Sequence, residues 1–359
     1  MKITDIKIEK FSAPLKKALR VAFGVVDVSD CWIVKVSTDE GIYGLGSAAP
    51  LGFVTGETLE TCYIILQLFA EALVGHDALD IAGAHAKMDN IVHGNGSAKC
   101  AIDIALHDIA GKHAGLPLYK LLGGTDPVVH NDITIGIDTV EQMVADAREY
   151  VFDKGFRILK IKIGNDLAHD VEALSAIRAL VGPDVRMRID ANQGYDIPTA
   201  LAAMKEFEKI GIDAAEQFLP WWDFEGAAEL KRQNTSALKL MLDESIHNVY
   251  DARRAFQLNC ADFYNIKLMK CGGLYWGAQI ADFALEHGVQ CMVGCMQENK
   301  ISITAGLSLV AAKKAIVEAD CDSFMFYKGD DDGLIGGFER DGGVFTLLDK
   351  PGLGIDLDF

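Results

Sequence analysis

Two lysines separated by a single residue mark the first stretch of this sequence that could do chemistry. Residues 157–164 read Arg-Ile-Leu-Lys-Ile-Lys-Ile-Gly, and their β-branched, apolar content predicts a strand. Lys160 and Lys162 then project from one face of that strand. If the face lines a pocket, each ammonium lowers the pKa of the other, and a lysine depressed in this way can act as a base near neutral pH. On this stretch alone, two lysines on the wet face of an edge strand are the better explanation.

Charged residues also stand at the ends of the other strands that the sequence predicts. After Pro127, strand and helix patterns alternate with a repeat of about 30 residues, which is typical of a (β/α) barrel. The eight predicted strands are 132–137, 157–164, 185–192, 213–218, 238–243, 263–269, 290–294 and 316–320. Barrel enzymes place catalytic groups at the carboxyl ends of their strands. Those ends carry Lys160, Lys162, Asp190, Asn192, Glu216, Asp243, Glu244, Lys267, Glu298, Asp320 and Asp322. One carboxylate alone could be a helix cap, but capping does not account for so many in succession.

Three consecutive strands offer carboxylates that could bind one metal ion. Asp190, Glu216 and Asp243 end the third, fourth and fifth strands, and neighbouring strands lie about 4.8 Å apart. The ligands are all hard oxygens, with no Cys or His among them, which favours Mg²⁺ over zinc. Without a cation the three carboxylates would repel one another, and their pKa values would rise. We therefore expect Mg²⁺ as the cofactor.

The barrel geometry places two lysines on opposite sides of this metal site. Lys162 ends the second strand and Lys267 ends the sixth, and strands four apart in an eight-stranded barrel lie opposite each other. Two opposed bases could remove a proton from one face of a carbon and return one to the other, while the metal holds a carboxylate and stabilises the enediolate. Asp320 and Asp322 end the eighth strand, across from the fourth, and would suit an ammonium at the far end of the substrate. A dipeptide is the simplest zwitterion that fits this span.

The chain before the barrel has a different pattern. The predicted elements are strands at 3–11, 31–37 and 42–46 and helices at 58–73, 80–92 and 97–114. The last helix is amphipathic, and Ser97 could cap it. Residues 19–24 and 51–57 could be mobile loops. We expect an α/β protein: a (β/α)7-8 TIM-like barrel at 126–342 with an N-terminal α+β capping domain at 1–125, which the C-terminal tail, about 343–359, folds back to complete.

The composition of the chain limits the kinds of partner and the cellular compartment that we expect. Half of the 359 residues are hydrophobic and 24% are charged, as in ordinary globular proteins. The formal net charge of −18 argues against nucleic acid as a partner, and no apolar run is long enough to span a bilayer. The eight cysteines show no CxxC pair, which favours free thiols in a reducing compartment. Since the N-terminus lacks the apolar core of a signal peptide, we expect a cytoplasmic protein. We also expect it to form a homo-oligomer and to act on a small-molecule substrate.

Together these motifs resemble the enolase superfamily, and within it the dipeptide epimerases of the muconate-lactonizing subgroup. The resemblance covers nearly the whole chain. The stretches that carry it are Lys160-Ile161-Lys162, Asp190-Ala191-Asn192-Gln193, Glu216-Gln217, Asp243-Glu244-Ser245, Asn265-Ile266-Lys267-Leu268-Met269-Lys270-Cys271-Gly272-Gly273, Gly294-Cys295-Met296-Gln297-Glu298 and Asp320-Cys321-Asp322. A lysine or histidine base combined with Mg²⁺ is a general feature of enolase-superfamily sites.

The resemblance implies an isomerase that inverts the α-carbon of the C-terminal residue of a dipeptide. In that family pattern Lys162 and Lys267 are the acid/base catalysts, and Lys160 assists near the substrate carboxylate. The implied Mg²⁺ ligands are Asp190, Glu216 and Asp243. The Asp-x-Asp residues Asp320 and Asp322 would hold the substrate α-ammonium, and Thr134 and Glu298 occupy further pocket positions.

The fourth strand departs from the family pattern. The family has Pro directly after Glu-Gln, whereas Glu216-Gln217 is followed here by Phe-Leu-Pro-Trp-Trp at 218–222, which puts the path of that loop in doubt. Trp221 and Trp222 could lie at the pocket rim or pack under a helix.

Substrate preference is set by the capping loops in this family. The residues of these loops are compatible here with several kinds of substrate side chain. The apolar residues Phe23, Phe53 and Val54 favour a hydrophobic dipeptide. Arg20 could instead pair with an acidic side chain. The run at 330–332, three aspartates, could attract a basic side chain, although such a run beside glycine is more often a solvated turn.

Three other functions compete with a dipeptide epimerase. A lyase or cycloisomerase on the same scaffold, such as an o-succinylbenzoate synthase, would share the lysines and the metal ligands but would not need Asp320 and Asp322. An N-acylamino acid racemase would likewise have no free ammonium to bind. A non-catalytic binding protein would need neither the two bases nor the three metal ligands.

Overall fold

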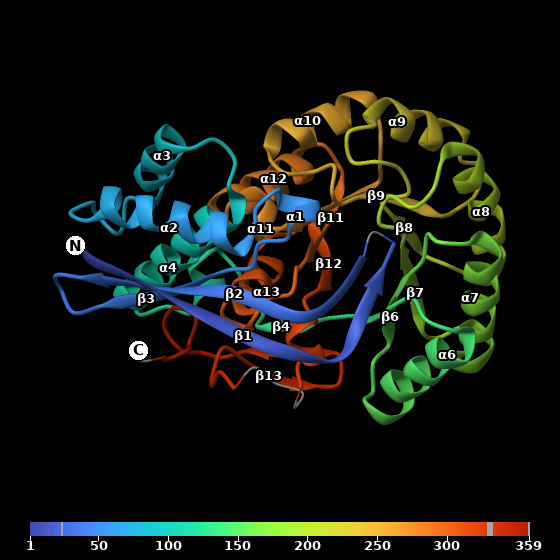
Figure 1. Ribbon diagram of the computed structural model, residues 1–359, viewed down its shortest axis with the longest axis horizontal. Helices are drawn as coiled ribbons and strands as arrows, with labels where there is room; N and C mark the ends of the chain where they lie inside the picture. The colour runs from blue at the N-terminus through green and yellow to red at the C-terminus, as the bar shows by residue number, and fades with distance from the viewer. Residues whose placement is uncertain (23, 329–332, 358–359) are drawn as a thin grey trace.

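The computed structural model describes residues 1–22, 24–328 and 333–357. Phe23 and the aspartate run at 330–332 lie outside the described residues, so their predicted contacts with substrate stay predictions. The chain forms a barrel surrounded by helices, with a layer of long strands and helices beside it (Figure 1). This confirms the predicted fold class, an α/β barrel with an N-terminal α+β region.

Eight parallel strands form the barrel and follow one another in sequence order. They are β5 (Ile133–Ile135), β6 (Ile158–Lys162), β7 (Arg186–Asp190), β8 (Ala214–Glu216), β9 (Lys239–Leu242), β10 (Phe263–Lys267), β11 (Gln290–Gly294) and β12 (Ile316–Asp320). Each lies within or overlaps a strand predicted from the sequence. The backbone N–H of Asp132 donates to the carbonyl of Ala319 over 3.2 Å, which joins the first strand to the last.

Strand register sets the position of the charged side chains along the barrel axis. Lys162 pairs with Asp190, and Asp190 pairs with Glu216. Because these three residues are the last of their strands, parallel pairing brings their side chains to the same rim of the barrel.

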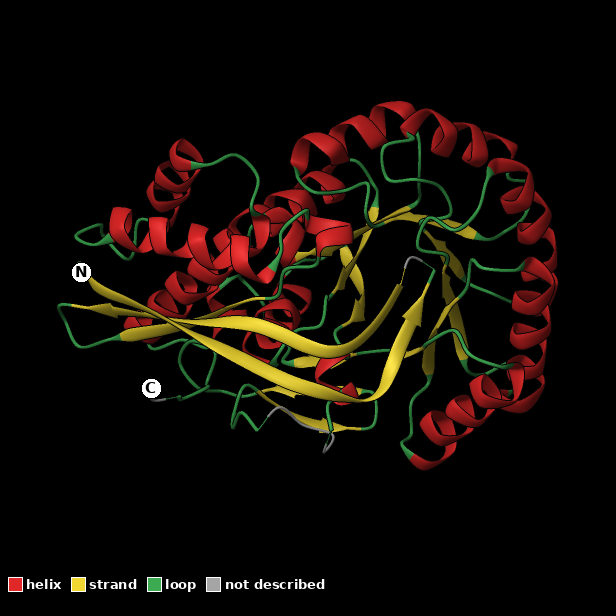
Figure 2. Ribbon diagram, in the orientation of Figure 1, coloured by secondary structure: helices red, strands yellow, loops and turns green. Residues whose placement is uncertain are grey.

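Helices cover the outside of the barrel (Figure 2). They are α6 (Val140–Arg148), α7 (Leu167–Val181), α8 (Ile197–Ile210), α9 (Phe224–Gln233), α10 (Val249–Leu258), α12 (Leu274–Glu286) and α13 (Lys300–Ala312), with the short helix η1 (Glu149–Asp153) after α6. Two further short helices, α11 (Leu268–Cys271) and η2 (Ser323–Phe326), follow β10 and β12 and face the N-terminal layer and the cleft. Asp166, Asp196 and Asp223 cap α7, α8 and α9 by accepting backbone N–H bonds. Capping therefore does not explain the strand-end carboxylates.

The N-terminal layer contains an antiparallel sheet of β1 (Ile3–Val21), β2 (Gly24–Thr38) and β3 (Tyr43–Ala48). The prediction of a mobile loop at 19–24 is wrong over 19–21, because β1 continues there and pairs with the start of β2. The carbonyl of Arg20 also accepts a 3.0 Å bond from the N–H of Ile137, just after β5. The hairpin thus extends from the N-terminal layer to the barrel (Figure 1). The second predicted loop contains a short helix, α1 (Gly52–Thr55).

The helices α2 (Leu59–Leu73), α3 (Ile81–Ile91) and α4 (Gly96–Ala114) match the predicted positions. Two details of α4 differ from the prediction. The helix is buried on nearly all sides rather than amphipathic, because it lies between the N-terminal sheet and α11 and α12 of the barrel. Its first turn is capped by Glu57 rather than Ser97: the carboxylate accepts the backbone N–H bonds of Ser97 and Ala98 over 3.0 and 3.3 Å.

The C-terminal segment contacts both the strand that precedes the barrel and the helices of the N-terminal layer. The strands β13 (Phe338–Asp341) and β14 (Val344–Leu347) form a small sheet with β4 (Val128–His130). Beyond them, the carbonyl of Gly352 accepts a 2.8 Å bond from Leu118, at the start of α5 (Leu118–Leu121), and Leu353 donates to Asp108 of α4. The division into domains at 1–125 and 126–342 stays a prediction. Among the described residues, no helix combines the length and apolar character that a membrane crossing requires.

The contact between β3 and α4 allows a test of this packing. A Cβ on Gly46 would lie 1.8 Å from the carbonyl oxygen of Ala101, so Gly46→Ala must push the helix away from the sheet. We expect it to reduce the free energy of unfolding by about 1–3 kcal/mol, measured as an earlier thermal transition. Gly52→Ala is the matched control, because its nearest neighbour atom lies 3.9 Å away. Equal transitions for the two variants would contradict the proposed tight contact.

Candidate active site

The three predicted metal ligands converge at the rim of the barrel. Asp190, Glu216 and Asp243 come from three successive strand ends, and each offers a carboxylate oxygen within 4.8 Å of the others. All three side chains are buried. Oxygen is the ligand that Mg²⁺ prefers, and each of the three residues offers a carboxylate oxygen at this one point. The donor set therefore fits a hard divalent cation.

Lysines surround this triad. The Nζ of Lys162 lies 2.7 Å from Oδ2 of Asp190, and the Nζ of Lys267 lies 2.7 Å from Oδ2 of Asp243. These lysines come from β6 and β10, four strands apart in the barrel order, and both line one cleft of about 70 Å³. The sequence thus predicted correctly that a lysine would reach the cleft from each of these opposed strands.

Lys160 connects two acidic groups of the site. Its Nζ lies 3.1 Å from Asp190, 2.9 Å from Glu216 and 2.7 Å from Asp320. The sequence argument that neighbouring ammonium groups lower its pKa is wrong. Burial does lower the pKa of Lys160, but Asp320, Glu216 and Asp190 outweigh that effect and raise it above its ordinary value.

The same neighbouring charges shift the pKa values of the triad carboxylates in different directions. Burial and the neighbouring Asp190 raise the pKa of Glu216 to about 8. Burial would also raise the pKa of Asp190, but Lys162 and Lys160 hold it at about 2. For Lys267, burial is outweighed by Asp243, and its pKa rises above the ordinary value. The negative charge of the triad therefore needs nearby cations to neutralise it.

A second acidic group lies across the cleft. The carboxylates of Asp132, Asp320 and Asp322 lie within 4.8 Å of one another and are buried. Asp322 accepts a 2.7 Å bond from the backbone N–H of Thr134, and burial and Asp320 raise its pKa to about 7. Asp132, which the sequence did not single out, is paired with Arg188. Three close carboxylates at one wall favour a positively charged ligand group.

Three further polar residues hold the triad in place, although no role was predicted for them from the sequence. Asn265 donates to Glu216 over 2.7 Å, and Lys270 donates to Asp243 over 2.5 Å. The amide oxygen of Gln217 accepts the backbone N–H of Asp243 over 2.8 Å. Strand alternation could have indicated Asn265, because it lies two residues before Lys267 and therefore faces the same side.

Glu298 does not belong to the described lining of the cleft. Its carboxylate accepts the backbone N–H of Met296 over 2.8 Å, and its own backbone N–H and carbonyl bond to Ser323. Burial raises its pKa. These contacts place Glu298 behind the wall formed by residues 295–297.

The N-terminal layer supplies an apolar roof. Leu19 and Val21 of β1, Val26 of β2, Leu51 and Val54 line the cleft that contains the lysines. Arg20, which alternates with Leu19 and Val21, is exposed and does not belong to the described lining. Among the described residues, the part of the roof contributed by the N-terminal layer is therefore made of aliphatic side chains.

The two tryptophans do not pack under a helix. Trp221 and Trp222 are 52% and 60% exposed and line a groove with α1. Val54 lines both this groove and the catalytic cleft. The loop after Gln217 thus follows a rim path, as one of the two sequence hypotheses predicted.

Fold and site together define a class of protein. Residues 3–123 match the family model of the mandelate racemase / muconate lactonizing enzyme N-terminal domain, and residues 142–359 match the enolase C-terminal domain-like model. The chain belongs to this family within the enolase superfamily.

Its relatives include named dipeptide epimerases. The chain is 40% identical to L-Ala-D/L-Glu epimerase of Clostridium acetobutylicum, over 99% of both chains. It is 39% identical to hydrophobic dipeptide epimerase of Enterococcus faecalis, over 90% of this chain and 91% of the relative. A crystal structure of the dipeptide epimerase from Enterococcus faecalis V583, complexed with Mg and L-Leu-L-Tyr, superposes with a TM-score of 0.96 at 37% identity, covering 99% and 100% of the chains. The predictions that the protein is an isomerase and that its cofactor is Mg²⁺ are confirmed.

The two acidic groups can be distinguished by metal binding. A cation bound only by the folded chain stabilises it by about 2.7 kcal/mol at 100 times its Kd, and we expect Mg²⁺ to delay thermal unfolding accordingly. Asp190→Asn and Glu216→Gln should abolish this shift, because each removes a charged ligand. Asp320→Asn, in the opposite acidic group, is the control and should keep the shift. The reverse pattern would place the ion at the second group.

Proposed function

We propose that this chain is a Mg²⁺-dependent dipeptide epimerase that inverts the α-carbon of the C-terminal residue: one lysine removes the α-proton and a second lysine returns a proton to the opposite face. One observation carries the proposal: Lys162 and Lys267 enter one cleft from opposed strands, between a metal-binding triad and a separate acidic wall. Carboxylate, α-carbon and ammonium of a dipeptide follow one another in the same order.

Each part of the site would act on one part of the substrate. Asp190, Glu216 and Asp243 would hold Mg²⁺, which would neutralise the negative charge that builds up on the substrate carboxylate as the α-proton leaves. Lys160, within 3.1 Å of two of these ligands, would stand beside that carboxylate.

The two lysines would then divide the proton transfer. One must be neutral to accept the α-proton, while the other is an ammonium that returns a proton to the opposite face. Each turnover exchanges their protonation states, so that both epimers are substrates. Asp243 beside Lys267 favours the ammonium form of that lysine.

The acidic wall would bind the free α-ammonium of the dipeptide. Asp320 and Asp322 line the cleft, and Asp132 adds a third carboxylate behind them. A lyase of the o-succinylbenzoate synthase type and an N-acylamino acid racemase would have no ammonium for this wall, which is why we favour the epimerase.

The roof supports an apolar C-terminal residue. Leu19, Val21 and Val54 cover the cleft above the lysines, where the side chain of the inverted carbon would lie. Arg20 is exposed, so an acidic side chain in the cleft would have no partner from β1. We therefore propose hydrophobic side chains at this position.

Cellular context stays at the level of prediction. All eight cysteines are free thiols, which supports a reducing compartment such as the cytoplasm. The expected homo-oligomer is a prediction that a sedimentation measurement can check.

Isotope exchange tests the reaction. The enzyme with Mg²⁺ in D₂O should replace the α-proton of the C-terminal residue with one deuteron in L,L-dipeptides whose C-terminal residue is apolar, read as a mass gain by mass spectrometry. Lys162→Ala should reduce inversion of the α-carbon by about 10²–10⁴-fold, the usual contribution of a general acid/base. Inversion at the wild-type rate by Lys162→Ala would exclude the two-lysine mechanism, and no exchange in any dipeptide by the metal-loaded wild-type enzyme would favour the lyase or N-acyl racemase functions.

The acidic wall has its own test. Asp320→Asn combined with Asp322→Asn removes the charges that would bind the ammonium, and we expect it to abolish exchange of free dipeptides while Mg²⁺ still stabilises the protein. N-acetylated dipeptides serve as the control substrate and should be poor with both enzymes. Unchanged turnover of free dipeptides by the double variant would contradict the assignment of this wall.

A further inference from the structure

The loop that follows β11 forms the wall of the catalytic cleft between Lys267 and Asp320. Strand order places β11 between β10, which ends in Lys267, and β12, which ends in Asp320. The loop residues in the described lining of the cleft are Cys295, Met296 and Gln297. A dipeptide with its α-carbon at the lysines and its ammonium at the acidic wall has its peptide group between the two, beside this loop.

Gln297 carries a buried oxygen that lacks a hydrogen bond. Its Oε1 is shielded from solvent and accepts no hydrogen bond from any residue that the structure describes. The same side chain lines the cleft. A buried acceptor without a donor is unfavourable, because it has lost its hydrogen bond to water without a replacement. This oxygen is therefore suited to a donor that a substrate brings into the cleft.

The backbone around Gln297 is held in place on both sides. The hydroxyl of Ser29, in β2, donates to the carbonyl of Gln297 over 2.8 Å. The backbone N–H of Met296 donates to the carboxylate of Glu298, and the backbone N–H of Glu298 donates to the hydroxyl of Ser323, over 2.8 and 3.0 Å. The carboxylate of Glu298 is thus bonded within the loop, and of these two neighbouring residues Gln297 is the one that lines the cleft.

Two other oxygens of the cleft also lack a partner, but they lie at its metal-binding end. Oδ1 of Asn192 and Oε2 of Glu244 are buried and accept no hydrogen bond from the described part of the chain. Asn192 follows β7 and Glu244 follows β9. Both therefore adjoin the metal-binding triad, where the substrate carboxylate is proposed to bind, and they are not placed for the peptide group.

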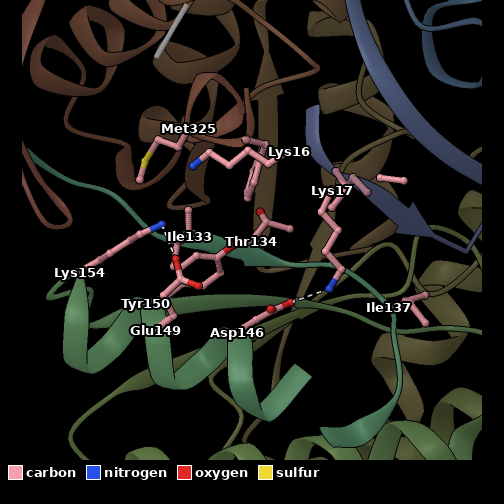
Figure 3. A pocket seen from close by; sticks show the side chains of 14 residues that line it. Lys16, Lys17, Ile133, Thr134, Ile137, Asp146, Glu149, Tyr150, Lys154 and Met325 are labelled. Carbon is pink, nitrogen blue, oxygen red and sulfur yellow. Dashed lines mark hydrogen bonds and ion pairs between the residues drawn. The ribbon is translucent and has the colours of Figure 1, made fainter. Parts of the chain in front are cut away.

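The opposite wall of the cleft is formed by β5. There Thr134 lines both the cleft and a second cavity of about 190 Å³ (Figure 3). The backbone N–H of Thr134 donates to Asp322 over 2.7 Å. Among the described residues, this wall contributes no buried oxygen without a partner to the cleft. At the level of the peptide group, the unpaired acceptor is thus Oε1 of Gln297.

We propose that Oε1 of Gln297 accepts a hydrogen bond from the peptide N–H of the substrate, and that Gln297 thereby selects a peptide over an ester that lacks this donor. The inference rests on the proposed dipeptide epimerase function. The cleft would then recognise the link between the two residues as well as their charged ends. Holding the peptide N–H also fixes the rotation of the α-carbon, because the two are directly bonded, and so orients the α-proton toward one lysine.

A pair of substrates tests this contact. In L-Ala-L-Leu the link is an amide, whereas in the L-alanyl ester of L-2-hydroxy-4-methylpentanoate an oxygen replaces the N–H. We expect Gln297→Leu to lower kcat/KM for deuterium exchange of the dipeptide about tenfold, as when one buried polar group loses its partner, and not to lower it for the ester. Because each substrate is compared between wild type and variant, the different acidities of the two α-protons cancel.

Two further variants separate the contact from a structural effect. Gln297→Glu keeps an acceptor oxygen and should retain more of the dipeptide activity than Gln297→Leu. Gln290→Leu is the matched control, since it makes the same change at the exposed first residue of β11, and it should leave both substrates unchanged. An equal loss on dipeptide and ester in Gln297→Leu, or an equal loss of dipeptide activity in Gln297→Leu and Gln297→Glu, would overturn the proposed hydrogen bond.

Failure of this inference differs from failure of the proposed function. If the wild-type enzyme exchanges the α-proton of L-Ala-L-Leu and Gln297→Leu does so equally well, the epimerase stands and the role of Gln297 is overturned. Absence of exchange in all dipeptides with the metal-loaded wild-type enzyme overturns both.

Discussion

The structure depends on balancing buried negative charge. Six carboxylates gather in two groups, and all six are buried; five stand at or just after the carboxyl ends of barrel strands, and Asp132 directly precedes β5. Removing a charge from water has a penalty of several kcal/mol unless a counter-charge or hydrogen bonds replace the solvent. Lys160, itself buried, contacts both groups and is therefore the central counter-charge of the site. The other lysines of the site and the metal ion neutralise the remaining negative charge.

The rest of the fold keeps these charges at fixed positions and away from water. Parallel strand register places Asp190 beside Glu216, and the side chains of Asn265 and Lys270 fix the carboxylates from behind. The N-terminal sheet covers the cleft from above through the tip of the β1–β2 hairpin. That hairpin is tied to the barrel through the carbonyl of Arg20. A drier cleft strengthens each electrostatic contact, so the roof serves both substrate selection and catalysis.

Much of the candidate site could be predicted because it follows from strand periodicity. Each ligand or base is the last charged residue of a strand or, for Asp243, the residue directly after one, and alternation of strand and helix indicated the barrel. The residues that escaped prediction act through contacts distant in sequence. Glu57 caps α4 from 40 residues away, and Asp132 joins Asp320 only because the barrel closes. The lysine pKa argument failed because it counted the neighbouring lysine and not the carboxylates contributed by other strands.

The sequence by itself determined the barrel, the order of its strands and the identities of the charged groups at their ends, because local periodicity and chain order are sufficient for these. Only the tertiary structure decided which charges meet, which way β1 faces over the cleft, and that a second cavity adjoins Thr134. Such features depend on the packing of segments far apart in the chain. Leu19 illustrates the difference: its sequence neighbourhood resembled a loop, and pairing with Val26 made it part of a strand whose alternation turns Leu19 inward and Arg20 outward.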